Sequence, residues 1–131
     1  MDARMLIVDD EQAVSSMLKV VFETEGYTVT TASSAAEARR LLAVQTFEVV
    51  LTDIRMESDA AGFEVVRAAR QRSDGSVIVI LTAFPIMAQD WRTAGADAAF
   101  TKPSNTPALL ATVRQLLEER GQRSTSSSPF S

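Results

Sequence analysis

Four polar side chains stand where short apolar runs of the chain end. Asp9 and Asp10 follow the first run, Asp53 ends the second and Thr82 ends the third. Hard divalent cations such as Mg²⁺ prefer carboxylate oxygens as ligands, and an aspartate can also act as a nucleophile toward phosphorus. If these acids lie together, the sequence predicts a metal-assisted phosphoryl-transfer site with Asp53 at its centre.

Each of these runs has the composition of a buried β-strand. They are short, rich in β-branched residues and bounded by polar or turn-forming residues, which is typical of a parallel sheet covered on both faces. In the segment 47–53, an apolar strand would carry one carboxylate to its exposed tip. The sequence predicts five strands, at residues 3–8, 27–31, 48–52, 77–81 and 98–101.

Between the strands, apolar side chains recur every three or four residues, which predicts amphipathic helices. In the first of them, Val14, Met17, Leu18, Val21 and Phe22 would form the buried face. We expect the first helix to start at an N-cap of Asp9 or Asp10, and the second at a capping box of Ser34 and Glu37. The third should start at Gly62 or Phe63 and the fourth at Pro85. The fifth should start at Thr106, as the N-cap before Pro107. We expect the first, fourth and fifth helices to end at Gly26, Gly95 and Gly121.

Strands and helices alternate five times along the chain. This order predicts a parallel sheet with helices on both faces and right-handed connections. Open sheets of this kind bind ligands at the carboxyl ends of their strands. That rule independently selects Asp9, Asp10, Asp53 and Thr82, because each of them follows a predicted strand.

The composition limits the classes of function. The chain has 131 residues, of which 46% are hydrophobic, and this suits one folded domain. It contains no cysteine and no histidine, which excludes disulfides, thiolate or imidazole metal ligands and a histidine phosphodonor within these residues. The net charge is −4 and the Lys and Arg residues are scattered, so we expect no nucleic-acid binding by this domain.

Two further expectations concern the location and the extent of the domain. No apolar run is long enough to span a bilayer, and we expect a cytoplasmic protein without membrane contact. We expect the domain to cover residues 1–121. Residues 122–131 form a polar, serine-rich segment with too little apolar content to pack, and are expected to be a disordered tail or a linker.

One more pair of residues completes a pattern. Asp9-Asp10 after the first strand, Asp53 after the third, Thr82-Ala83 after the fourth and Lys102-Pro103 after the fifth resemble the response-regulator receiver domain of two-component signalling, in the CheY-like superfamily. The resemblance covers roughly residues 4–120. It implies a flavodoxin-like (βα)5 three-layer α/β sandwich, whose parallel five-stranded sheet has the strand order 2-1-3-4-5.

The resemblance implies a metal site and a phosphoacceptor. Asp53 would accept the phosphoryl group. Asp9 and Asp10 would bind Mg²⁺, directly or through water, together with the Asp53 carboxylate and the backbone carbonyl of Arg55. Three carboxylates within about 5 Å repel one another by about 3 kcal/mol per pair at an effective dielectric constant near 20, so they would hold a divalent cation well.

The resemblance also implies how the domain would signal. Lys102 would pair with the phosphoryl group, and Thr82 would hydrogen-bond one of its oxygens. The donor would be a phosphohistidine on a sensor histidine kinase or a histidine phosphotransfer protein. The domain would not be an enzyme beyond its own phosphotransfer and autodephosphorylation, and its output face would be the fourth helix, fifth strand and fifth helix, which could also form a homodimer.

The chain departs from the family pattern between Thr82 and Lys102. Ala99 stands where the family usually has an aromatic residue that moves with the threonine, so that coupling is not expected here. Phe100 should point to the opposite face of the strand, toward the core. The interval is also shorter than usual, and we expect at least one of its large apolar residues in the core: Ile86, Met87 or Trp91.

Two other departures lie in loops. Glu57 replaces the family's usual proline in a loop that is one residue longer than usual, and this loop also contains Asp59. We expect both acids to be solvated, with an effect on metal affinity as the alternative. Ser104 replaces a common bulky apolar residue, which should change only local packing.

Three other functions compete with the phosphoacceptor. A receiver-like interaction module with little phosphorylation-dependent switching is favoured by Ala99 and by the short segment before it. A haloacid-dehalogenase-type phosphatase would need an acid two residues after Asp53, where Arg55 stands. A flavin-binding flavodoxin would need a hydroxyl- or glycine-rich phosphate loop after the first strand, where the acids of residues 9–11 would repel phosphate.

Overall fold

The computed structural model describes residues 3–73, 75–83, 88–102 and 105–126, which form five strands and five helices in strict alternation. The strands lie within one residue of the predicted ranges at each end. Their bounds are β1 Arg4–Val8, β2 Thr28–Ala32, β3 Val49–Thr52, β4 Val77–Thr82 and β5 Ala98–Thr101.

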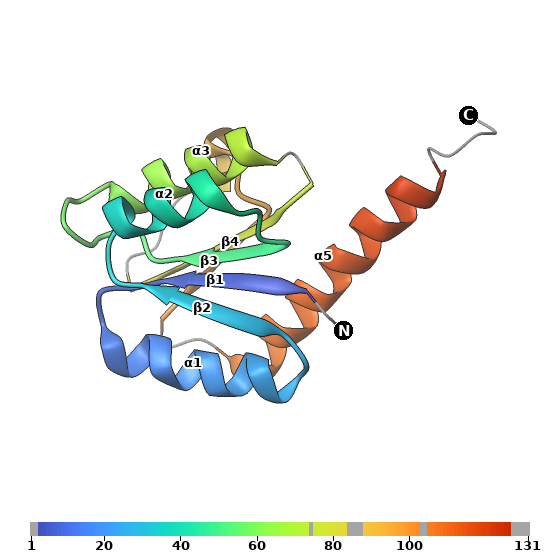
Figure 1. Ribbon diagram of the computed structural model, residues 1–131, viewed down its shortest axis with the longest axis horizontal. Helices are drawn as coiled ribbons and strands as arrows, with labels where there is room; N and C mark the ends of the chain where they lie inside the picture. The colour runs from blue at the N-terminus through green and yellow to red at the C-terminus, as the bar shows by residue number, and fades with distance from the viewer. Residues whose placement is uncertain (1–2, 74, 84–87, 103–104, 127–131) are drawn as a thin grey trace.

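The helices cover both faces of the sheet. Figure 1 shows α2 and α3 on one face and α1 with the start of α5 on the other. Trp91 and Ala94 of α4 pack on the same side as α2 and α3. The bounds are α1 Gln12–Thr24, α2 Ala35–Val44, α3 Ala61–Arg72, α4 Ala88–Ala94 and α5 Thr106–Ser126.

All strand pairs in the sheet are parallel, and the order is β2-β1-β3-β4-β5, as the sequence predicted. The chain order reverses between β1 and β3, so the carboxyl ends of these two strands form the switch point where such sheets bind ligands. Val8 pairs with Thr52 in the register of the two strands. The residues that follow them therefore leave the sheet side by side.

Two apolar cores lie on the two faces of the sheet because strand side chains alternate in direction. Leu6 and Val50 face α2 and α3, whereas Ile7 and Leu51 face α1 and α5. All four side chains are buried. Burial on both faces explains why the sequence of the central strands is apolar without interruption.

The first helix buries a narrower stripe than its sequence pattern predicted. Leu18 and Phe22 are buried, but Met17 is 50% exposed, so its assignment to the buried face was wrong. Ser15 is also buried, and it donates its hydroxyl hydrogen to the carbonyl oxygen of Gln12 at 3.2 Å. A helix presents only part of a broad apolar stripe to a sheet, and Met17 lies at the margin of that stripe.

Two helix starts differ from the predictions. Glu11, not an aspartate, is the N-cap residue of α1, and it makes no side-chain cap hydrogen bond. Asp9 and Asp10 therefore precede the cap. At α5, the side chain of Asn105 accepts a hydrogen bond from Ala108 N at 3.1 Å, so Asn105 takes the cap role expected of Thr106. The predicted helix start at Pro85 lies outside the described residues, as do Ile86, Met87 and Ser104.

The last helix is longer than expected. It continues through Gly121 to Ser126, and Figure 1 shows its second half running away from the sheet. Glycine in a helix interior costs only about 1 kcal/mol relative to alanine, so the flanking residues can carry the helix across it. The expected helix end at Gly121 was therefore wrong. A domain boundary at residue 121, followed by a disordered tail or linker, stays a prediction.

An acid shared by two arginines ties the elements together at the amino end of β5. Asp97 Oδ2 accepts hydrogen bonds from Ile78 N at 2.8 Å and from Arg70 at 3.1 Å, and its Oδ1 accepts one from Arg120 at 2.5 Å. Arg70 also donates to the carbonyl oxygens of Gly95 and Ser76. This network joins α3, β4, α4 and α5 at one point.

We predict that Asp97→Ala lowers the free energy of unfolding by about 2–4 kcal/mol, because the partly buried guanidinium groups and a backbone N–H lose a shared carboxylate. Urea denaturation followed by circular dichroism measures this. Asp90→Ala, at an exposed position on α4, is the matched control and should change stability by no more than about 0.5 kcal/mol. Equal stabilities of the two variants would contradict the assignment.

Candidate functional site

The register of β1 and β3 places two acids next to each other. Asp9 N continues the ladder to Ala32 O at 3.0 Å, and Asp53 N continues it to Val8 O at 2.9 Å. Both aspartates are buried, with exposures of 4% and 6%. Asp10 follows on the exposed side, and ligand oxygens of the three carboxylates lie within 4.8 Å of one another. The structure therefore brings together the acids that the sequence selected.

A lysine from the edge of the sheet balances part of this charge. Lys102 Nζ lies 2.7 Å from Asp9 Oδ2, 3.1 Å from Asp53 Oδ2 and 2.9 Å from Glu11 Oε1. Burial by itself would lower the pKa of Lys102, but its hydrogen bonds to Asp9, Glu11 and Asp53 outweigh burial and raise the pKa. Burial also raises the pKa of Asp9, although Lys102 opposes that shift.

Sequence reasoning did not assign Glu11 to this cluster. Its position directly after Asp9 and Asp10 is the signal that could have placed it there. The structure shows that it is the third carboxylate on Lys102. The Glu11 side chain is largely exposed, whereas that of Lys102 is mostly buried.

Thr82 and Lys102 are connected through the backbone. Thr82 ends β4, where it is paired with Thr101, and Lys102 N donates to Thr82 O at 2.7 Å. Thr82 is 2% exposed. The predicted threonine and lysine therefore lie at the same sheet edge as Asp9 and Asp53, and a shift of one backbone segment would be passed to the other.

The orientation of Asp53 is fixed by short-range contacts. Its Oδ1 accepts a hydrogen bond from Ile54 N at 2.7 Å, which leaves Oδ2 for Lys102. Thr52 Oγ1 donates to Asp53 O at 2.8 Å. Gly62, in the first turn of α3, packs so closely that a Cβ there would lie 2.0 Å from Asp53 O. No sequence pattern predicts that this glycine lies against the site.

The structure corrects the expectation for Glu57. Its carboxylate accepts hydrogen bonds from Ala35 N at 2.9 Å and Ala36 N at 3.1 Å, at the start of α2, so it is not simply solvated. The hydrogen bond from the Ala35 backbone is the main cause that lowers the pKa of Glu57. Asp59 does agree with the expectation, because its side chain is 93% exposed and approaches Arg55 only at 3.9 Å.

The edge strand β5 keeps the predicted alternation of side chains. Phe100 packs against the core on the α1 and α5 side, whereas Ala99 packs against the core on the opposite side. Trp91 is half-buried and packs against that same opposite core, which agrees with the expectation of a core residue in this segment. The guanidinium of Arg92 lies 4.9 Å from the centre of the Trp91 ring.

The donor set fits a hard divalent cation. Among the described residues, it consists of carboxylate oxygens, two of the three acids are buried, and the Lys102 ammonium group faces them. Mg²⁺ prefers oxygen ligands and keeps several waters, which suits a site that is open on the side of Asp10. The side chain of Arg55 is half exposed, and its Nε lies 3.9 Å from Asp59 Oδ1.

A parallel 2-1-3-4-5 sheet with an acid cluster and a lysine at its carboxyl edge defines a receiver-type signalling domain. The family model described as the response regulator receiver domain matches residues 5–114, and the chain belongs to this family. Among the described helices, none combines the length and the apolar character that crossing a membrane requires.

Curated relatives share this domain within longer chains. The alginate biosynthesis transcriptional regulatory protein AlgB of Pseudomonas putida is 39% identical over 116 residues, which are 86% of this chain and 26% of that protein. The response regulator MprA of Mycobacterium ulcerans is 35% identical over 121 residues, which are 89% of this chain and 51% of that protein. This chain thus spans about a quarter to a half of their length.

Solved structures agree with the assignment. A CheY-like receiver domain protein from Methanospirillum hungatei superposes with a TM-score of 0.86 at 30% identity, over 94% of this chain and 99% of that chain. The response regulator TrrA of Thermotoga maritima, in complex with Mg²⁺ and BeF, superposes with a TM-score of 0.77 at 31% identity, over 88% of this chain and 99% of that chain.

We predict that Gly62→Ala lowers the free energy of unfolding by about 2–3 kcal/mol, because the added methyl group would overlap the Asp53 carbonyl and displace the β3–α3 connection. Gly121→Ala is the control, since a Cβ there meets nothing within 4 Å and should stabilise α5 by up to about 1 kcal/mol. Chemical denaturation of both variants decides this. A Gly62→Ala variant as stable as wild type would contradict the close approach.

We also predict a pH-dependent effect of Asp9→Asn when Mg²⁺ is absent. The pKa of Asp9 is raised in the folded state, so the stability that its proton provides is fully present below the ordinary value of 3.8 and is lost as the pH rises through the folded-state pKa. Asparagine has no such loss. The variant should therefore gain stability relative to wild type as the pH rises above about 3.8.

Adding Mg²⁺ at pH 7 should reverse the order, because the cation stabilises the state whose carboxylates bind it. Thermal unfolding with and without Mg²⁺ measures both effects. A stability difference between the two proteins that is independent of pH and of Mg²⁺ would contradict this account of Asp9.

Proposed function

We propose that this receiver domain is the phosphoacceptor of a two-component phosphorelay. Asp53 accepts a phosphoryl group from a phosphohistidine of a sensor histidine kinase or a histidine phosphotransfer protein, in a Mg²⁺-dependent reaction. The observation that carries the proposal is Lys102 Nζ, held between the buried carboxylates of Asp9 and Asp53. A fixed cation beside a nucleophilic oxygen is what a transferring phosphoryl group requires.

The residues that would hold Mg²⁺ are Asp9, Asp10, Asp53 and the backbone carbonyl of Arg55. Their support here is the acid cluster within 4.8 Å. When bound, the metal would neutralise charge on the phosphoryl oxygens. The complex of the similar Thermotoga maritima protein with Mg²⁺ and BeF supports the choice of metal.

The proposed reaction is a displacement at phosphorus. An Oδ atom of Asp53 forms the new P–O bond, the P–N bond to the donor histidine breaks, and the released ring nitrogen takes a proton from solvent. Lys102 pairs with a phosphoryl oxygen, and the hydroxyl of Thr82 donates a hydrogen bond to another. Water later attacks the phosphorus of the aspartyl phosphate, which restores Asp53 and releases phosphate, so the domain is not an enzyme acting on a separate substrate.

The output would come from the surface of α4, β5 and α5. Thr82 and Lys102 lie where β4 and β5 lead toward these helices, and the Lys102 N–Thr82 O hydrogen bond joins the two connections. A change at this surface would alter contacts with a protein partner or form a homodimer, without direct contact to nucleic acid or membrane. The relatives named as transcriptional regulators and response regulators favour a cytoplasmic signalling role.

One observation favours a second function, in which the domain binds partners with little dependence on phosphorylation. Ala99 offers no aromatic side chain that could move with Thr82, and the nearby Phe100 packs into the opposite core. The site would then be intact while its connection to the output surface is weak.

We predict that Asp53→Asn abolishes phosphate incorporation from a small acyl-phosphate donor in the presence of Mg²⁺, since the nucleophilic oxygen is lost. Intact-protein mass spectrometry measures the incorporation. Asp59→Asn removes a charge from an exposed position in the same loop and should incorporate phosphate like wild type. Undiminished incorporation in Asp53→Asn would show that another residue is the acceptor.

The same proteins separate the two functions. If phosphorylation changes the oligomeric state or partner binding of wild type but not of Asp53→Asn, the phosphorylation-dependent function holds. If partner binding is the same in both proteins, with or without donor, the interaction module is the better description.

A further inference from the structure

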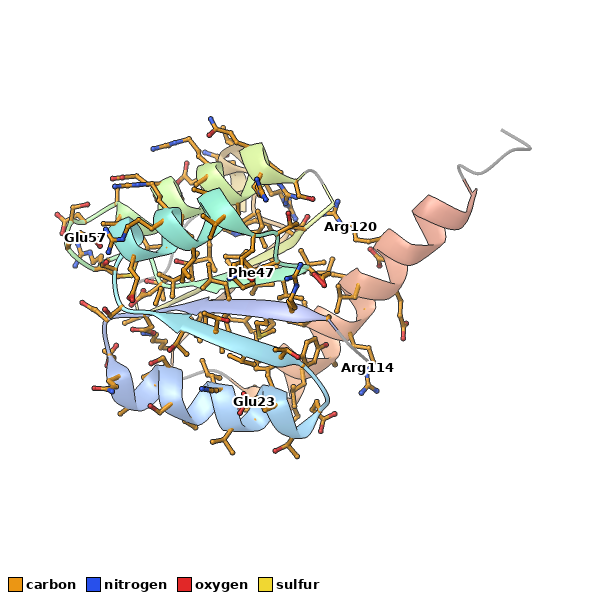
Figure 2. All side chains as sticks on the ribbon, in the orientation of Figure 1. Glu23, Phe47, Glu57, Arg114 and Arg120 are labelled. Carbon is orange, nitrogen blue, oxygen red and sulfur yellow. The ribbon has the colours of Figure 1, made fainter. Side chains whose placement is uncertain are left out.

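The β3–α3 loop, residues 53–60, is attached at its tip to a different helix. Glu57 Oε1 accepts a hydrogen bond from Ala35 N at 2.9 Å, and Oε2 accepts one from Ala36 N at 3.1 Å. Figure 2 shows Glu57 where the loop runs beside the start of α2, at the end of the molecule opposite Arg120. Both carboxylate oxygens of Glu57 thus accept hydrogen bonds from backbone N–H groups that lie more than twenty positions away in the sequence.

The contact uses the electrostatics of a helix start. The first N–H groups of a helix have no partner within the helix, and this end carries a partial positive charge. Ser34 Oγ accepts from Glu37 N at 3.1 Å, which satisfies one of these groups from within α2. Glu57 satisfies two more from outside. The exposed Glu57 side chain therefore caps α2, and separating the loop from α2 would leave the Ala35 and Ala36 N–H groups without these acceptors.

The other side of the loop is held against α3. Gly62 N donates to Ile54 O at 2.8 Å, and Gly62 lies against the Asp53 carbonyl. The segment from Asp53 to Glu57 is therefore fixed at both ends, and Arg55 lies in the middle of it. A proline, which the family usually has at position 57, restricts this loop by its ring. Glu57 restricts it by an attachment to α2.

We propose that Glu57 is a positioning residue, which holds the loop in the conformation that presents Asp53 and the Arg55 carbonyl to Mg²⁺. This rests on the proposed phosphoacceptor function for the use of the metal, but the attachment itself does not depend on it. Glu57 does not bind the metal in this account, because α2 occupies both of its carboxylate oxygens. Its effect on the site is through the backbone.

Three variants of the full chain separate this role from a simple effect of charge. Glu57→Ala removes the attachment and one negative charge. Glu57→Gln removes the same charge but keeps one oxygen acceptor for α2. Asp59→Ala removes an equal charge from an exposed side chain two residues away. In the described part of the chain, Asp59 makes no hydrogen bond to α2.

Two measurements are made on each variant. Titration with Mg²⁺ alone gives the dissociation constant, and amide hydrogen exchange at Ala35 and Ala36 reports the attachment without any metal. We expect Glu57→Ala to weaken Mg²⁺ binding by roughly tenfold, as residues that support metal ligands do, and to speed exchange at both amides. Glu57→Gln should recover part of both losses, and Asp59→Ala should bind Mg²⁺ like wild type.

The rate of phosphorylation by an acyl-phosphate donor adds a third measurement. Glu57→Ala should be slow at low Mg²⁺ and approach the wild-type rate when Mg²⁺ saturates the site, because the loop can be drawn into place by the metal. Equal Mg²⁺ affinity in Glu57→Ala and Asp59→Ala, together with faster exchange at Ala35 in Glu57→Ala alone, would overturn the positioning role. If wild type binds Mg²⁺ but takes up no phosphate, the phosphoacceptor function fails while the comparison of affinities still decides the role of Glu57.

Discussion

The candidate site of this domain depends on one buried charge contact, the Lys102 ammonium against Asp9 and Asp53. Two buried carboxylates at the edge of an apolar sheet would be costly without a cation beside them. In the sheet order, β5 lies beyond β4 from β3, so a long side chain is needed to reach the acids. The contact can form only if β1, β3 and β5 hold their register, and the site therefore reports the alignment of most of the sheet.

The two ends of the sheet balance the charge of partly buried carboxylates in opposite ways. At the amino end of β5, one carboxylate, Asp97, is shared by two arginines and a backbone N–H, and its charge is fully met. At the carboxyl edge, one ammonium faces several carboxylates, and negative charge remains. The first arrangement stabilises the packing of α3, α4 and α5. The second leaves an electrostatic deficit that a divalent cation would fill.

The loop that follows Asp53 combines constraints of both kinds. Gly62 gives it a steric limit, because no larger residue fits against the Asp53 carbonyl. Glu57 gives it an electrostatic one through the first turn of α2. No comparable constraint comes from Ala99 on β5, because its small side chain offers no bulky group that could couple to Thr82. The printed constraints on the site thus lie at β3, at the loop after Asp53 and at the start of α2.

The sequence alone determined the alternation of elements, the strand order through the family resemblance, and the clustering of Asp9, Asp10, Asp53, Thr82 and Lys102 at one edge. It could do so because apolar strands, turns and the rule for carboxyl ends of parallel strands are local or topological properties. Only the tertiary structure decided which acids share Lys102, where Glu57 and Asp97 bind, and that α5 passes Gly121. These outcomes depend on distances between segments that are far apart in the chain, and on the competition among several acids for a few donors.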